Sequence, residues 1–216
     1  ERMCRAMKLR YREILVWRSG GVIANAGVMG LTGRVRYVLL SDALLSNMSE
    51  PEIEAIFARE AGHIREHHIF YSLLFVIASF GLVPPAVFVL AELAGVPGDA
   101  ADWAGVAALA AVWGFGFGWV SRRFERQCDV ISAWATGGGD PQGRITQEGA
   151  ALFARALQRV AELNGVPHRR HDWRHGSIAR RVEHILWLGT IGGSRAGIDR
   201  LVQIIPTCTD FNPSFP

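Results

Sequence analysis

The chain has 216 residues, which is enough for one domain with a substantial hydrophobic core. Of its residues, 50% are hydrophobic and 20% charged, and the mean hydropathy is +0.17, as expected of a protein that is part soluble and part membrane-embedded. A net charge of +3 is too small to indicate bulk nucleic-acid binding, so no nucleic-acid partner is expected. The three cysteines, Cys4, Cys128 and Cys208, are odd in number and widely spaced, which argues against a disulfide framework.

The N-terminal part of the chain is predicted to be rich in β-structure. The sequence begins at Glu1 without an initiator methionine or a signal-peptide pattern, so we expect a segment of a longer membrane protein. Three short β-prone runs at 11–17, 22–26 and 35–40 are separated by glycine-rich breaks. They predict a small antiparallel sheet within a β-rich region of residues 1–48.

Residues 49–68 are predicted to form a helix. Ser49 is suited to cap it, Glu52 stands where a capping box needs a carboxylate, and Pro51 is tolerated in the first turn. Apolar residues then keep helical spacing at Ile53, Ile56, Phe57 and Ile64.

Residues 69–120 are predicted to form a transmembrane hairpin. Two almost purely apolar runs, 69–94 and 103–120, each approach the ~20 residues needed to cross a bilayer. Basic residues flank both outer ends of the hairpin, whereas the connecting loop carries Asp99 and Asp102. By the positive-inside rule, both outer ends face the cytoplasm. The alternative is a buried hydrophobic hairpin in a soluble protein.

The C-terminal part, residues 121–188, is predicted to be helical. Helices are expected near 124–134, 146–163 and 177–188, and the tail 189–216 is irregular by composition. The fold class is therefore α+β and mainly α, with a single domain across the whole chain.

Residues 59–63 read Arg-Glu-Ala-Gly-His and match the zinc-protease helix motif H-E-x-x-H except at its first position. That motif places two imidazoles one helical turn apart on a Zn²⁺ ion, with the glutamate as general base toward a metal-bound water. Glu60 is therefore predicted to be catalytic and His63 to be a metal ligand. Arg59 occupies the other ligand position, and a guanidinium, which has no acceptor and keeps its proton, cannot bind a cation.

A third zinc ligand is predicted at Glu125, on the helix that follows the hairpin. If the apolar runs form a hairpin, the helices that carry Glu60 and Glu125 emerge side by side on one membrane face, which would bring Glu125 to His63. Asp129 lies one turn further on, where it can orient a ligand. The alternative is that Glu125 is one charge of a juxtamembrane cluster with neighbouring arginines.

Taken in order, these segments resemble the HtpX / CAAX-prenyl-protease family of integral-membrane zinc metallopeptidases. The resemblance covers most of residues 11–188. It rests on Asn25-Ala26 in a glycine-rich strand region, the Leu44-Leu45 turn into Ser49-Glu50-Pro51-Glu52, Glu60-x-x-His63, the membrane hairpin, Arg122-Arg123-x-Glu125-x-x-x-Asp129 and His175-Gly176-Ser177-Ile178-Ala179-Arg180-Arg181.

The resemblance implies one Zn²⁺ ion held by His63 and Glu125, with Glu60 as the general base that activates water for peptide-bond hydrolysis. His175 and Arg181 match a downstream pair that would stabilise the oxyanion of the tetrahedral intermediate.

The resemblance also implies partners and a location. The strand at Asn25 and Ala26 would be an edge that holds an extended substrate by strand addition. Substrates would be peptides or membrane proteins, beside membrane lipid. The location would be the bacterial inner membrane with the catalytic face cytoplasmic, and membrane-protein quality control is favoured over CAAX processing.

Arg59 leaves several hypotheses open. In the first, the chain is an inactive relative that acts as a binding or regulatory protein. Arg59 would then place a fixed positive charge at the zinc position, paired with Glu60 or Glu125. Another is that Arg59 arises from a sequence error or a single-base change in an otherwise active lineage.

A further hypothesis keeps the metal through different ligands. Residues 63–67 fit the inverted zincin pattern H-x-x-E-H, which would pair His63 with His67. Cys128, one turn from Glu125, would alternatively supply a thiolate, which binds zinc well.

Overall fold

The structure is a computed structural model that describes residues 3, 7, 9–30, 32–140, 142–170 and 172–192. Almost all of the predicted tail 189–216 lies outside the described residues. In chain order the elements are β1 (Glu13–Trp17), β2 (Ala26–Met29), β3 (Tyr37–Ser41), α2 (Asp42–Asn47), α3 (Glu50–Arg65), α4 (His68–Leu93), α5 (Gly98–Ala111), the π-helix η1 (Val112–Phe117), α6 (Gly118–Thr136), α7 (Gln147–Leu163) and α8 (Ile178–Thr190).

The N-terminal sheet is mixed, so the prediction of an antiparallel sheet was wrong. In the described part of the chain the strand order is β1-β3-β2, with β1 parallel and β2 antiparallel to β3. The predicted second strand, 22–26, also begins too early. The Asp42 carboxylate accepts hydrogen bonds from the backbone N–H groups of Ser19 and Gly20, both at 3.0 Å, and so holds the chain in a turn. The segment that joins β1 to β2 is too long for a tight hairpin. In the sheet, β3 lies between β1 and β2.

The predicted helix 49–68 is two helices in the structure. The capping box at its start is confirmed, because the Ser49 N–H donates to Glu52 Oε2 at 2.9 Å. The helix α3 ends at Arg65, however, and α4 begins at His68. Between them His67 adopts a left-handed conformation with φ of 54°, which interrupts the helical path.

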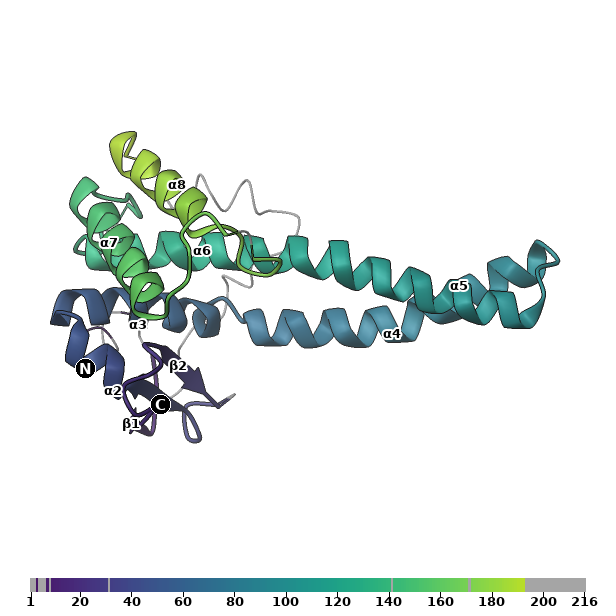
Figure 1. Ribbon diagram of the computed structural model, residues 1–216, viewed down its shortest axis with the longest axis horizontal. Coiled ribbons are helices and arrows are strands. Elements are labelled where there is room, and N and C mark those ends of the chain that lie inside the picture. Colours follow the sequence, from purple (N-terminus) through teal and green to yellow (C-terminus); the bar gives the residue numbers. More distant parts are fainter. Residues whose placement is uncertain are drawn as a thin grey trace.

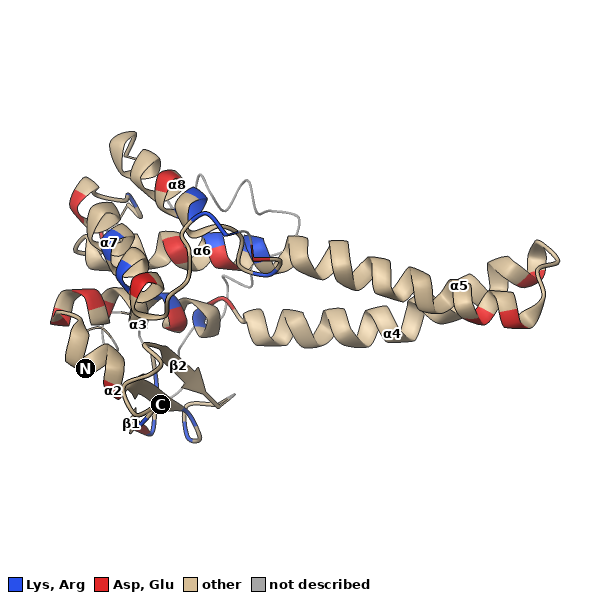
Figure 2. Ribbon diagram, in the orientation of Figure 1, with Lys and Arg blue, Asp and Glu red and all other residues tan. Residues whose placement is uncertain are grey.

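The hairpin is confirmed as a pair of long apolar helices. The helix α4 has 26 residues, and α5, η1 and α6 join into one helix of 39 residues. Within the described residues these two are long and apolar enough to cross a membrane, and only 6% and 17% of their apolar stretches are buried in the protein. Figure 1 shows the hairpin projecting far beyond the other elements. In Figure 2 its shaft lacks charges, acidic residues mark its far tip, and basic residues gather at its base.

The remaining helices pack into a core beside the base of the hairpin (Figure 1). Small residues on α3 let it approach α6 closely, and the Ser132 hydroxyl of α6 donates to the Ala55 carbonyl oxygen of α3 at 2.7 Å. Behind them α7 contributes Phe153, which is fully buried in the main hydrophobic cluster. This packing fixes α3 and α6 side by side, the arrangement that the candidate site needs.

Candidate functional site

The helix α3 presents Arg59, Glu60 and His63 toward α6, as the motif predicts. Both carboxylates nearest to Arg59 bind its guanidinium: one Nη donates to Glu60 Oε1 and the other to Glu125 Oε2. Arg59 Nε lies 3.7 Å from Asp129 Oδ1, and among the described residues this buried nitrogen has no hydrogen-bond partner. Arg59 thus takes the central position between three carboxylates.

Glu125 is the residue on which the site converges. Its side chain is only 5% exposed. Besides Arg59, it contacts His175 Nδ1 at 2.7 Å, Arg181 Nη2 at 3.4 Å and His63 Nε2 at 3.9 Å. The predicted approach of Glu125 to His63 across the hairpin is therefore present in the structure.

Asp129 lies one turn beyond Glu125 and binds Arg181 through two parallel hydrogen bonds. Arg181 Nε donates to Oδ2 at 2.8 Å and Nη2 to Oδ1 at 2.6 Å, and both side chains are buried. Such a forked pair is strong and geometrically defined. This pair holds α8 against α6 and directs Arg181 into the site. The oxyanion role of Arg181 stays a prediction.

The loop before α8 delivers His175 to the site. Asp172 Oδ1 accepts hydrogen bonds from the backbone N–H groups of Arg174 and His175, both at 2.8 Å, which forms a tight turn. The Trp173 indole donates to the Gly114 carbonyl oxygen in η1 at 2.6 Å. The loop is thereby fastened to the membrane hairpin while His175 reaches Glu125.

Burial and the central guanidinium shift the proton affinities of the α3 residues. Burial raises the pKa of Glu60, although Arg59 beside it acts in the opposite direction. Burial, and next the charge of Arg59, lowers the pKa of His63 to about 3. His63 is therefore neutral at physiological pH, the form in which imidazole can bind a metal.

The inverted motif at residues 63–67 is not formed. Because α3 ends at Arg65, His63 and His67 do not share a continuous helix. His68, which sequence reasoning missed, lies beside His63 instead, with 3.0 Å between their Nδ1 atoms. Cys128 Sγ lies 3.6 Å from His68 Nδ1. Only the histidine pair at 67–68 could have drawn attention to His68 in the sequence.

The site opens into a cleft of about 840 Å³. Asn25, Ala26 and Val28, at and beside β2, line this cleft together with Glu60 and His63. β2 is an edge strand. The predicted substrate edge thus borders the predicted catalytic residues, and its role in binding is untested.

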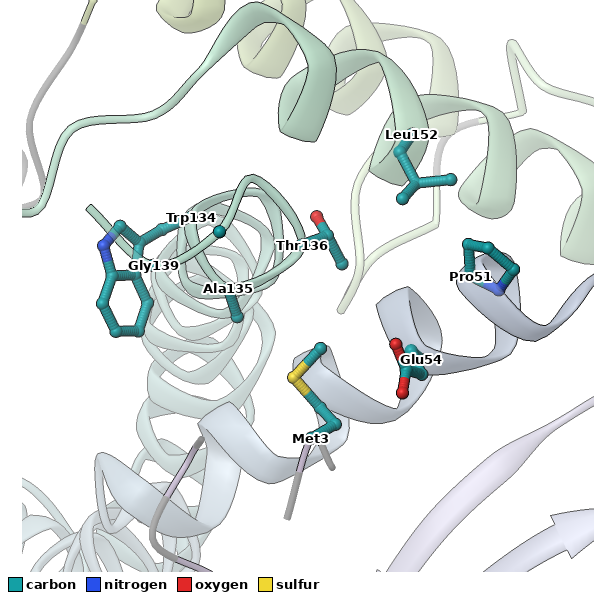
Figure 3. Close-up of a pocket in the computed structure, with 9 residues that line it drawn as sticks. Met3, Pro51, Glu54, Trp134, Ala135, Thr136, Gly139 and Leu152 are labelled. Atoms are coloured by element: carbon teal, nitrogen blue, oxygen red, sulfur yellow. The ribbon is translucent and has the colours of Figure 1, made fainter. Parts of the chain in front are cut away.

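A second cavity, of about 500 Å³, lies at the opposite end of α3. Figure 3 shows Pro51 and Glu54 of α3 at this cavity together with Trp134 and Thr136 of α6 and Leu152 of α7. None of the residues around Arg59 lines it, so it is separate from the site.

Comparison with known families matches residues 1–185 to Peptidase family M48. The chain belongs to this family. The resemblance drawn from the sequence is thereby confirmed, and it places the chain among zinc metallopeptidases. No curated protein and no solved structure matches the chain.

The zinc ion that M48 membership implies does not fit the residues at the family position. Two of the expected donors, His63 and Glu125, are present, but the third is Arg59. Its guanidinium bonds to both Glu60 and Glu125, so a proton-bearing cation occupies the place where the carboxylates would face a metal. The chain keeps the M48 framework and replaces the metal's charge with that of an arginine.

Proposed function

We propose that this chain is a membrane-bound M48 protein that binds extended segments of peptides or membrane proteins in its cleft without hydrolysing them. The observation that carries the proposal is the pairing of Arg59 with Glu60 and Glu125. Arg59 supplies no ligand atom at the first zinc position. Its guanidinium also pairs with Glu60, the expected general base, and with Glu125, the expected third ligand. A fixed guanidinium, unlike Zn²⁺, neither activates water nor accepts an oxygen ligand.

The cleft supports peptide binding independently of catalysis. An edge strand has unpaired backbone donors and acceptors on its outer side, and an extended peptide can add to it as a further strand. β2 is such an edge, and Asn25, Ala26 and Val28 place it along the cleft. At the site itself, His175, whose side chain is 46% exposed, offers a polar group to the bound chain.

The hairpin supports attachment to a membrane. A core helix of a soluble protein would be mostly buried, whereas the shafts of α4 and α5 expose large side chains such as Phe80, Leu82 and Trp103. The hairpin has acidic residues at its tip and basic residues where it joins the rest of the protein, and this distribution favours a cytoplasmic position for the cleft (Figure 2). A bacterial inner membrane and a part in membrane-protein quality control are the setting in which such a protein would act.

The deciding experiment is the substitution Arg59→His in the detergent-solubilised protein. We expect the unaltered chain to leave unfolded casein intact, and the Arg59→His variant to bind zinc through residues 59, 63 and 125 and to cleave casein. Both chains should bind a fluorescent extended peptide. The matched control is Arg59→His with Glu60→Gln, which keeps the ligands and loses the general base, so cleavage should fall by a factor of about 10² or more.

An active peptidase is the second candidate. It is favoured by the survival of Glu60, His63, Glu125 and His175 in one cluster around the cleft. Cleavage of casein by the unaltered chain, abolished by Glu60→Gln, would establish this candidate and overturn the first. A failure of peptide binding in both chains would overturn the binding role whatever the proteolysis result.

A further inference from the structure

His63 has two further side chains of metal-binding type beside it, His68 and Cys128, on the side that faces away from the peptidase centre. One ligand atom each from His63, His68 and Cys128 lies within 4.8 Å of the other two. They come from the end of α3, the start of α4 and the middle of α6. His68 and Cys128 are buried, with exposed fractions of 3% and 0%, while His63 borders the cleft.

The two nitrogens of His63 point to different surroundings. Nε2, the atom on the side of the peptidase centre, faces Glu125 Oε1 at 3.9 Å. Nδ1 faces His68 Nδ1 at 3.0 Å, and this His68 atom lies 3.6 Å from Cys128 Sγ. An ion bound on the Nδ1 side would therefore be a different site from the one that defines the family.

The two printed separations, 3.0 Å between the imidazole nitrogens and 3.6 Å from His68 Nδ1 to Cys128 Sγ, are close to those between neighbouring donors of a tetrahedral zinc ion. Metal–nitrogen bonds near 2.1 Å and metal–sulfur bonds near 2.3 Å place adjacent donors roughly 3.3 to 3.6 Å apart. Gly62 makes room for the sulfur, because a Cβ at that position would lie 3.2 Å from Cys128 Sγ. The backbone of α3 thus already admits the thiol beside the two imidazoles.

The surroundings of His68 are those of a metal-bound imidazole. His68 Nε2 contacts Gln127 Oε1 at 3.0 Å, and Gln127 Nε2 donates to Glu66 Oε2 at 3.0 Å. Metal-binding histidines usually donate their second N–H to such an oxygen, which fixes the ring and its tautomer. The ring also stacks on Phe124, with centroids 4.0 Å apart, so its orientation is set from two directions.

The charges of the cluster leave room for a dication. With its carboxylates ionised, Glu60, Glu125 and Asp129 carry one more charge than Arg59 and Arg181 neutralise. A Cys128 thiolate would add another negative charge. A Zn²⁺ ion beside them would bring the buried group to neutrality, which low-dielectric surroundings favour.

We propose that His63, His68 and Cys128 form a zinc site that joins α3, α4 and α6 at the base of the membrane hairpin, displaced from the peptidase centre. The ion would clamp the junction where α3 ends and the hairpin begins, at the left-handed residue His67. The proposal does not depend on whether the cleft hydrolyses or only binds peptides.

The test is metal analysis of the purified, detergent-solubilised chain, with Co²⁺ as a spectroscopic probe. We expect one equivalent of zinc, and after exchange a thiolate-to-cobalt charge-transfer band. Cys128→Ala should abolish the band, and His68→Phe, which keeps a ring against Phe124, should abolish stoichiometric binding. Gln127→Leu should weaken zinc binding by about 10- to 100-fold, as loss of an orienting partner does.

Two matched controls separate this site from its rivals. Glu125→Gln removes a ligand of the peptidase centre, and His67→Asn, which suits a left-handed residue, removes the other member of the inverted motif. Both should keep the zinc and the cobalt band.

The proposal is overturned if the unaltered chain binds no zinc or if the cobalt form lacks a thiolate band. The proposal is also overturned if Glu125→Gln loses the zinc and Cys128→Ala keeps it, because the ion would then lie at the peptidase centre. Because zinc content and the cobalt spectrum are measured on the unaltered chain, these two overturning results do not rest on the folding of any variant.

Discussion

Arg59 has an electrostatic role that a neutral side chain cannot take over. It lies between Glu60, Glu125 and Asp129, and the last two are almost fully buried. Without a cation, carboxylates this close repel one another and lose hydration without compensation. Arg181 alone would then offset their charge.

We therefore expect Arg59→Met to destabilise the protein by about 2–4 kcal/mol, because removing one partner of a buried ionic cluster leaves uncompensated charge. Thermal unfolding in detergent at neutral pH measures this. The double variant Arg59→Met with Glu125→Gln should recover part of the loss. An Arg59→Met protein as stable as its parent would show that the cluster does not need the guanidinium.

His63 should make the stability depend on pH. Its pKa is about 3 in the folded protein, chiefly because of burial and then of Arg59, against an ordinary value of 6.5. Below pH 6.5 the unfolded chain takes up a proton that the folded chain refuses, so the free energy of unfolding falls as the pH falls toward 3. By pH 5 the loss from this residue is roughly 1–2 kcal/mol, after allowance for partial exposure.

Unfolding midpoints of the parent and of His63→Gln, both stripped of metal with a chelator, at pH 7 and pH 5 isolate this contribution. The parent should lose more stability than the variant over this interval. An equal loss in both proteins would contradict the assignment.

At the scale of the elements, the contact between α6 and α7 depends on a glycine. A Cβ at Gly149 would lie 2.2 Å from the Ala133 carbonyl oxygen and 2.7 Å from the Gly137 backbone. These are backbone atoms, so relief requires the two helices to separate.

Gly149→Ala should consequently destabilise the protein by about 3 kcal/mol or more, since overpacking against backbone is not relieved by a rotamer change. The exposed neighbour Gln147→Ala provides the control and should change stability little. Unfolding midpoints of the two variants give the comparison, and a Gly149→Ala protein with the parent's midpoint would show that the helices can separate without cost.

For the whole molecule, the proposed topology places the hairpin tip and the cleft on opposite sides of a membrane. The two apolar shafts carry no charge between the acidic tip and the basic base (Figure 2). Single cysteines at the two ends should therefore differ in their access to reagents.

In cells that express a chain with Cys4 and Cys208 replaced by serine, a membrane-impermeant maleimide should label Asp99→Cys without lysis. Gln142→Cys, on the exposed surface of the globular end, should react only after lysis. Cys128 is buried and should contribute no background. Labelling of both positions only after lysis, together with recovery in the soluble fraction, would favour the soluble hairpin instead.

Local patterns were sufficient to predict much of the architecture. The capping box at Ser49, the two apolar runs and the spacing of Glu60 and His63 depend on residues within a few turns of one another. The mixed sheet was not predictable in this way, because the parallel pairing of β1 with β3 joins residues more than twenty positions apart, such as Glu13 and Tyr37. The break at His67 was missed because nothing in a helical spacing pattern marks a left-handed residue.

By itself the sequence determined that this chain has a zincin-type helix, a membrane-length hairpin and an arginine at a zinc-ligand position, because periodicity and side-chain chemistry are local properties. Only the tertiary structure decided what Arg59 pairs with and which groups surround His63. Arg59 and Glu125 are 66 residues apart, and His68 and Cys128 are 60 apart. Such pairs form only when the hairpin returns α6 to α3 and the packing of small side chains sets their distance.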